Sequence, residues 1–260
     1  MGASGAEGGT VGKALGLLDE IAALGRPVRF AELLAGSDHP KATLYRLLQT
    51  LTNQGMLTYA PEDQTYRLGV RLVRLAHAAW RQSSLAPIAR PHLDALSARL
   101  GLTVHLAQLD GGQVLYVDKR NAAEPIQMFA EAGRVGPGYC TGIGKAMLAH
   151  LPDAERAAAL SQQSFHRYTP ATLPDAGALA AELADIRRDG HAFDREEHEP
   201  GIICVAAPIL SATGRVHGGL SVTTSTDRAT LEAHAAHAPL LKETAAQIAV
   251  EADNWRFPDA

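Results

Sequence analysis

The sequence contains few of the residues on which several classes of protein depend. Its 260 residues include only two cysteines, Cys140 and Cys204, too few for the disulfide framework of a secreted domain. No apolar run approaches the roughly 18 to 20 residues that a membrane-spanning helix needs. The first ten residues contain neither a basic nor an apolar segment, unlike a secretory signal. We therefore expect a cytoplasmic protein with no membrane partner and a disordered tail at residues 1–9.

Spacings typical of metal and nucleotide sites are also missing. The chain has no H-x-x-x-H, H-E-x-x-H or paired C-x-x-C motif, so it predicts no metal site. A phosphate-binding loop requires glycine, four residues and then Gly-Lys-Ser/Thr. Around Gly144 and Lys145 this pattern fails twice, because Tyr139 stands at the first glycine and Ala146 at the hydroxyl position. We accordingly expect neither a metal nor a cofactor.

Charge is distributed unevenly along the chain. The formal net charge is −4, which argues weakly against a nucleic-acid partner. Residues 11–82, however, carry nine Lys and Arg against six Asp and Glu, whereas residues 83–260 carry fifteen against twenty-one. A small basic module joined to an acidic body indicates that the two halves have different partners; chance alone is the alternative explanation of this feature.

The first 83 residues show helical periodicity, and a hairpin signal follows within them. Apolar residues that include Val11 and Leu15 recur at helical spacing and predict a first helix from Thr10 to about Gly25. Two further helices are predicted at residues 30–35 and 40–54. Two strands at 56–60 and 64–68 and a linker helix at 69–84 complete the pattern. This order predicts a winged helix-turn-helix over residues 10–68.

The third predicted helix has two different faces. Its leucines at 44, 47, 48 and 51 follow the spacing of a core face. The opposite face has no acidic residue and offers a guanidinium, amides and a hydroxyl, which suit base edges and phosphates in a major groove. A solvated surface helix is the alternative, although such helices usually mix both charge signs. The predicted DNA-binding residues are Lys41, Ala42, Thr43, Tyr45, Arg46, Gln49 and Asn53.

The linker helix carries an apolar seam. Leu72, Leu75, Ala76 and Ala79 follow helical spacing, and Trp80 lies beside them. Because one recognition helix contacts only a few base pairs, specificity normally requires symmetric half-sites. We therefore predict that this seam is a dimer surface.

The run HPKATLYRLLQTLTNQGMLTYAPEDQTYRLGVRLVRLA resembles the DNA-binding end of the isocitrate-lyase-regulator (IclR-type) family. It contains K-x-T-x-x-R-L-L-x-x-L, then G-x-L and Y-x-L-G, and the resemblance extends over about residues 11–255. One departure is Lys13, where the family often has arginine. The resemblance implies a bacterial transcription regulator, more often a repressor, that binds double-stranded operator DNA as a homodimer or a dimer of dimers.

Residues 85–255 combine strand-like and helical segments. Asp110-Gly111-Gly112 separates two strand-like runs, which is a strong hairpin signal. Hairpins interleaved with helices predict an α+β domain with an antiparallel sheet, and the resemblance implies a GAF-like effector domain. The expected strands are 102–109, 113–119, 126–130, 201–210 and 216–224. One helix is expected to end at Gly101, and further helices are expected at 142–150, 153–160, 175–190 and 228–254. The last of these should be broken at Pro239.

Two segments of this domain resemble the walls of the family's effector pocket. In RVGPGYCTGIGKAMLAHLP, Gly138-Tyr139-Cys140 replaces a frequent leucine-histidine-small sequence, and Gly142 replaces alanine. The second segment is FDREEHEPGIICVAAPILSATGRVHGGLSVTTS. The resemblance implies that the effector-binding residues are Tyr139, Cys140, Thr141, Gly142, Asp194, Cys204, Ser221 and Thr223.

The chemistry of these residues agrees with a small polar ligand. Ser221 and Thr223 lie two residues apart and therefore face the same side of a strand, opposite a carboxylate and a thiol. Such groups suit an organic acid or a sugar-derived compound, and small aromatic acids also bind members of the family. Taken singly, each residue is better explained by a structural hydrogen bond, and a tight turn is the alternative explanation of the glycines. The pattern as a whole is what points to an effector pocket.

Two other functions are open to the same residues. A thiol-based redox sensor would use Cys140 and Cys204, and a Cys/His hydrolase would pair one of them with one of eleven histidines. A catalytic cysteine requires a basic, partly exposed setting. Cys204 instead lies in the apolar run Ile202–Ala206, which favours a non-enzymatic regulator with no catalytic residue.

Overall fold

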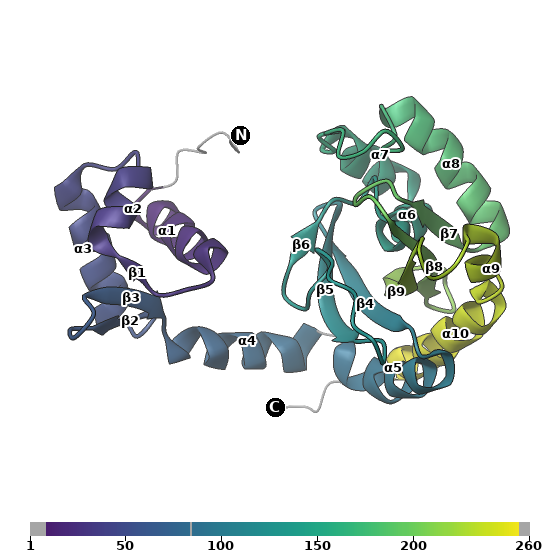
Figure 1. Ribbon diagram of the computed structural model, residues 1–260, viewed down its shortest axis with the longest axis horizontal. Coiled ribbons are helices and arrows are strands. Elements are labelled where there is room, and N and C mark those ends of the chain that lie inside the picture. The colour runs from purple at the N-terminus through teal and green to yellow at the C-terminus, as the bar shows by residue number, and fades with distance from the viewer. Residues whose placement is uncertain (1–8, 84, 255–260) are drawn as a thin grey trace. The chain divides into compact units, whose positions relative to one another are not determined.

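The computed structural model of the chain describes residues 9–83 and 85–254, without the side chains of residues 80–83. Internal contacts divide the chain into two compact units, Met1–Ser83 and Ser84–Ala260 (Figure 1). The predicted disordered tail falls, apart from Gly9, outside the described residues. Among the described residues, no helix has the length and apolar character needed to cross a membrane.

The first unit is a winged helix-turn-helix, as the sequence predicts. Its strands pair antiparallel in the order β1-β3-β2, and β2 and β3 form the predicted hairpin. The two-residue strand β1 is too short to leave a signal in the sequence. The elements are α1 (Thr10–Leu24), β1 (Val28–Arg29), α2 (Phe30–Gly36), α3 (Lys41–Asn53), β2 (Leu57–Ala60), β3 (Thr65–Leu68) and α4 (Val70–Ser83).

One compact apolar cluster holds this unit together. The four leucines of α3 are all buried, and they pack with Leu17, Leu18 and Ile21 of α1. The expectation that Val11 and Leu15 also face this core is wrong, because their side chains are 73% and 54% exposed. Helix α1 therefore buries only the face that carries Leu17, Leu18 and Ile21, and Val11 and Leu15 are not covered by other residues of the unit.

The second unit is built on a six-stranded antiparallel sheet in the order β6-β5-β4-β9-β8-β7. This confirms the predicted α+β class. The strands are β4 (Thr103–Asp110), β5 (Gln113–Arg120), β6 (Val135–Gly136), β7 (Ala192–Arg195), β8 (Ile202–Leu210) and β9 (Val216–Ser225).

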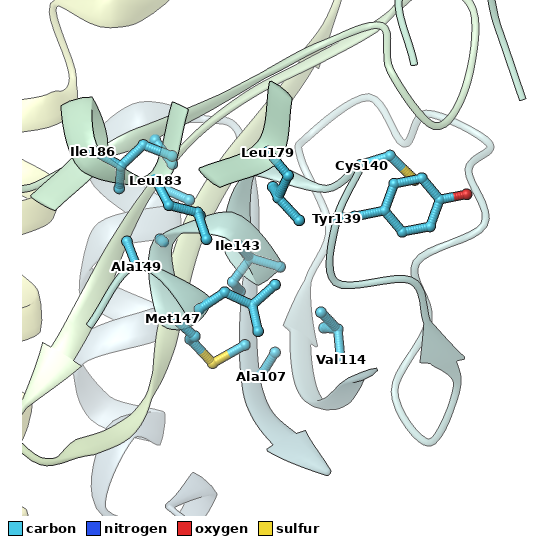
Figure 2. Close-up of a cluster of buried hydrophobic side chains, with 14 of the residues drawn as sticks. Ala107, Val114, Tyr139, Cys140, Ile143, Met147, Ala149, Leu179, Leu183 and Ile186 are labelled. Atoms are coloured by element: carbon cyan, nitrogen blue, oxygen red, sulfur yellow. The ribbon is translucent and has the colours of Figure 1, made fainter. Parts of the chain in front are cut away.

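Helices cover both faces of this sheet (Figure 1). On one face α10 packs on β8 and β9, and α5 packs on β4 and β5. On the other face α6 contacts the central strands, and α8 packs outside α6. The buried cluster of Figure 2 fills the space between α6, α8 and the sheet. The helices are α5 (Ala86–Leu100), α6 (Gly142–Leu148), α7 (Asp153–Ser161), α8 (Ala176–Asp189), α9 (Leu231–Ala235) and α10 (Ala238–Asn254).

Two expectations for the second unit are wrong. Residues 126–130 form no strand, and the edge of the sheet is instead the short strand β6 at Val135–Gly136. Pro239 does not break the C-terminal helices, because the interruption precedes Ala238 and α10 contains the proline in its first turn. A proline is tolerated there since the first N–H groups of a helix have no intrahelical partner.

Candidate functional site

The outward face of α3 has the exposure that its sequence predicts. Lys41, Ala42, Tyr45, Arg46, Gln49 and Asn53 are exposed, whereas Thr43 is half-buried. Within the described part of the chain, Lys41, Arg46 and Gln49 form no side-chain hydrogen bond or ion pair. A surface with free cationic and amide groups and no acid can dock on phosphates and base edges.

A groove beside this face includes residues that the sequence reasoning missed. It lies between the start of α3 and the β2–β3 hairpin, and Arg29, Tyr59 and Gln64 contribute to it along with Lys41 and Tyr45. Arg29 also donates a hydrogen bond from Nε to the carbonyl oxygen of Asp63 in the hairpin turn, at 3.3 Å. No periodic pattern reveals these residues, because the fold brings them together from separate elements.

In the second unit, a small enclosed cavity lies between the sheet and the start of α6. Its volume of about 30 Å³ corresponds to roughly two water molecules. Six of the eight predicted effector residues line it: Thr141, Gly142, Asp194, Cys204, Ser221 and Thr223.

The other two predicted effector residues do not line this cavity. Tyr139 and Cys140 are buried in the hydrophobic cluster between the sheet and α8 (Figure 2). The Tyr139 ring packs on Phe165 with centroids 5.0 Å apart, and its hydroxyl donates to the carbonyl oxygen of His166 at 2.5 Å. Their chain neighbours reach the cavity, but these two side chains turn toward the core.

The floor of the cavity is a polar patch on three adjacent strands. In the sheet register, His105 of β4 pairs with Ser221 of β9, and Thr223 of β9 pairs with Cys204 of β8. Residues two apart on one strand share a face, so these four side chains form one surface. His105 was not predicted from the sequence, because its place on this face depends on the pairing of β4 with β9.

His105 is buried without full hydrogen bonding. Its side chain is 2% exposed, its Nδ1 lies 3.4 Å from Thr223 Oγ1, and its Nε2 has no hydrogen-bond partner. Burial, assisted by the charge of Lys119, lowers the pKa of His105 to about 3, against a smaller opposing effect of the Ala130 carbonyl group. The imidazole is therefore neutral, and a buried polar atom of this kind requires a partner.

Asp194 places a carboxyl group in the same cavity. It is 6% exposed, and its Oδ1 accepts the backbone N–H of Glu197 at 2.8 Å. Burial, with the nearby charge of Glu197, raises the pKa of Asp194 to about 7, because the charged form is disfavoured where water is excluded.

The two cysteines lack the environment of reactive thiols. Both are buried, and burial is the largest cause that raises the pKa of Cys140 and of Cys204, with the charge of Asp194 adding to it. Reactive cysteines require the opposite shift, since the thiolate is the nucleophile. The structure therefore gives no support to the redox sensor or the hydrolase.

Lys145, which follows Gly144 in the failed phosphate-loop motif, has a different role. Its side chain is fully buried. Its Nζ donates to Glu182 Oε1 of α8 at 2.7 Å and also to Glu197, whose backbone N–H binds Asp194. Lys145 thus joins α6, α8 and the turn after β7 through its ion pairs with the half-buried Glu182 and the buried Glu197, and it does not line the cavity.

Gly142 sets the distance between α6 and the cavity floor. A Cβ atom at this position would lie 2.6 Å from Cys204 Sγ and 2.9 Å from the backbone nitrogen of Asp194. Real Cβ contacts are not this short, so a side chain here would displace α6 from the strands. The glycine therefore keeps the start of α6 directly against β7 and β8.

The opposite side of the cavity is apolar and includes residues from irregular backbone. Met128, Phe129 and Ala130, in the segment between β5 and β6, line it. The Phe129 backbone N–H donates to Glu199 Oε2 at 2.9 Å, and its ring packs on His198 with centroids 5.0 Å apart. These lining residues were not predicted, because the sequence had suggested a strand here.

A winged helix-turn-helix joined to a domain with an enclosed, partly polar cavity is the architecture of a ligand-responsive transcription regulator. Two family models match the chain: IclR helix-turn-helix domain over residues 10–61, and bacterial transcriptional regulator IclR C-terminal over residues 77–250. The chain belongs to the IclR family of bacterial transcription regulators.

Individual members of the family resemble the chain over most of its length. It is 35% identical over 219 residues to the HTH-type transcriptional regulator XynR of Escherichia coli (strain K12), covering 84% of this chain and 87% of that protein. It is 33% identical over 207 residues to the DNA-binding transcriptional repressor YiaJ of the same strain, covering 78% and 73%. The crystal structure of an IclR homolog complexed with 4-hydroxybenzoate, from Microbacterium hydrocarbonoxydans, superposes with a TM-score of 0.82 at 23% identity, over 95% of this chain and 100% of that one.

Proposed function

We propose that this regulator is a repressor that binds operator DNA through α3 and releases it when a small hydroxylated organic acid occupies the cavity of the second unit. One observation carries the proposal: six residues selected from the sequence as effector contacts converge on a single enclosed cavity, although they come from four separate segments. As a regulator of transcription it would act in the cytoplasm, and none of its residues is assigned a catalytic role.

The cavity has a polar side and an apolar side, which together suit an organic acid with hydroxyl groups. Hydroxyl, imidazole and carboxyl groups form the floor, whereas Met128, Phe129 and Ile202 supply apolar surface. A ligand larger than two waters requires the lining to move, and Met128 and Phe129 lie on backbone outside any helix or strand. The complex of a homologous protein with 4-hydroxybenzoate supports a ligand with a carboxylate, a hydroxyl and an apolar body.

The regulator would bind DNA as a homodimer or a dimer of dimers. On the predicted seam of α4, Leu75 is 51% exposed, and Ala76 and Ala79 are exposed beside it. Leu72, in contrast, packs partly against the core of its own unit, and the Trp80 side chain lies outside the described residues. An exposed apolar surface of this kind supports association with a second copy.

Replacing Arg46 with alanine should weaken operator binding by about 1–3 kcal/mol, or five- to a hundred-fold, if its guanidinium reads a guanine edge. Thermal stability and effector binding should not change, because the side chain is exposed and has no partner within the described residues. Footprinting on one operator measures the effect. Arg188→Ala, which removes an exposed arginine of the second unit, serves as the control, and undiminished protection by Arg46→Ala would exclude the assignment.

Replacing Ser221 with alanine should weaken effector binding by about 1–3 kcal/mol, since a polar atom of the ligand would lose its partner in a nearly dry site. Calorimetric titration with 4-hydroxybenzoate and D-gluconate measures this change. The effector concentration that releases DNA should rise by the same factor, because the two binding events are linked. Weaker effector binding with an unshifted DNA response would show that a different site controls the operator; Ser161→Ala, at an exposed position, is the matched control.

A further inference from the structure

The cavity offers an acidic ligand no lysine and no arginine. Among its fifteen lining residues, the ionisable side chains are His105, Tyr116, Asp194, His198, Glu199 and Cys204. His105 is neutral, as its lowered pKa shows. Glu199 also lines the cavity and is ionised, because bonds from His198 and the Phe129 backbone lower its pKa despite burial. An organic anion would therefore meet carboxylate charge, and His198, the other lining side chain that can carry positive charge, already lies with its Nδ1 3.8 Å from Glu199 Oε2.

The cation that acts on Asp194 is already neutralised. Lys145 is fully buried and donates to Glu182 and Glu197, so two carboxylates offset its charge. Arg195 donates to Glu182 as well, at 2.8 Å, and is exposed. Two carboxylates in one water-excluding space cannot both ionise at low cost, and a single shared proton removes this conflict.

We propose that the effector is bound together with one proton, which is held between the carboxyl group of Asp194 and the carboxylate of the ligand. This inference rests on the proposed function, since it assumes an organic acid as effector. Its consequence is that the regulator responds to acid and pH jointly: the same effector concentration releases more DNA in a more acidic cytoplasm.

The groups that act on Asp194 itself supply little compensating charge, whereas His198 and Arg134 act by charge on Glu199. The carboxyl of Glu197 and that of Glu199 disfavour ionisation of Asp194, and only Lys145 opposes them by charge. The remaining neighbours stay uncharged, because burial raises the pKa of each: Tyr116 on β5, Cys140 before α6, and Cys204 on β8. Below the raised pKa of Asp194 the proton is already present; above it, one proton is taken up on binding.

The test measures acid binding as a function of pH. Isothermal titration of 4-hydroxybenzoate and D-gluconate into the full-length protein, in buffers of different ionisation enthalpy, reports affinity and proton uptake. With a pKa near 7, affinity should fall about 30-fold from pH 6 to pH 8.5, and uptake should rise from near zero to about one proton. The neutral amides 4-hydroxybenzamide and D-gluconamide should not weaken with rising pH.

Variants separate this effect from a general change of the cavity. Asp194→Asn keeps an acceptor for the Glu197 N–H but cannot ionise, so acid binding should become nearly independent of pH and exceed that of the wild type at pH 8.5. Glu199→Gln removes the other lining carboxyl, which is ionised throughout, and should keep the wild-type dependence on pH.

A measurement without ligand distinguishes the possible failures. Because the pKa of Asp194 is raised on folding from 3.8 to about 7, its contribution to stability is lost as pH rises through that window. Urea unfolding should therefore show wild type losing stability relative to Asp194→Asn between pH 4 and pH 7. The inference would be overturned if the difference in stability between wild type and Asp194→Asn were the same at pH 4 and pH 7, or if acid binding were equally tight at pH 6 and pH 8.5. If the unfolding result is as expected but neither acid binds at either pH, the proposed acid effector is overturned instead.

Discussion

Replacing Lys145 with methionine is expected to destabilise the second unit by about 3–5 kcal/mol, the usual cost of removing one partner from a buried ion pair. The variant keeps the length and apolar stem of the side chain, but it leaves the buried carboxylate of Glu197 without its cation, whereas the half-buried Glu182 keeps its ion pair with Arg195. Glu197 already has an Oε2 atom without a hydrogen-bond partner, and burial raises its pKa in spite of Lys145. Urea unfolding of wild type and variant measures the loss.

The pH dependence of this loss identifies its cause. Without Lys145 the pKa of Glu197 should rise further above its unfolded value, so the variant's stability should decline as pH increases and the deficit should be larger at pH 8 than at pH 5. Adding Glu197→Gln should restore part of the stability. Arg188→Ala breaks an exposed ion pair with Asp185 and should have no measurable effect. A deficit that is the same at every pH would indicate a packing defect in place of an unpaired charge.

Replacing Leu75 with glutamate is expected to reduce operator affinity about 100-fold or more. If the exposed apolar surface of α4 joins two copies, a charge at its centre separates them, and each half-site must then be bound without the gain in effective concentration that the dimer provides. The unit itself should stay folded, because Leu75 is 51% exposed within it. Light scattering and gel shifts on a two-half-site operator measure assembly and affinity together.

A matched control is available on the second unit. Val250 of α10 is 61% exposed, so Val250→Glu introduces the same charge at an exposed aliphatic position of the second unit. It should leave the mass in solution and the DNA affinity unchanged. A Leu75→Glu protein that has the wild-type mass and binds DNA as tightly as before would show that copies associate through another surface.

Sequence periodicity predicted the helices well because each repeats a local pattern over several turns. The four leucines of α3 define its buried face without reference to any other element, and all four are buried in the structure. The strand predicted at residues 126–130 is wrong because a short apolar segment does not reveal what it packs against. The apolar side chains of these residues had suggested a strand, but Met128 and Phe129 are apolar because they line a cavity, and no neighbouring strand pairs with them.

The site was predictable only in part because its residues meet through strand pairing. Asp194, Cys204, Ser221 and Thr223 were found by resemblance, whereas His105 could be found only after β4 was placed against β9. Tyr139 and Cys140 show the limit of a contiguous motif. They are adjacent to Thr141 and Gly142 in sequence, yet a change of backbone direction before α6 turns their side chains into the core.

The close approach of Gly142 to Cys204 constrains the order in which this binding site can evolve. A methyl group at position 142 would stand 2.6 Å from the sulfur of Cys204 and 2.9 Å from the backbone nitrogen of Asp194. Alanine at 142 is therefore not an independent step: it becomes acceptable only after α6 has moved, since a smaller residue at 204 would leave the contact with the Asp194 backbone in place. Met128 and Phe129 line the same cavity from backbone outside any helix or strand, so the shape of the cavity can change there more readily than at Gly142.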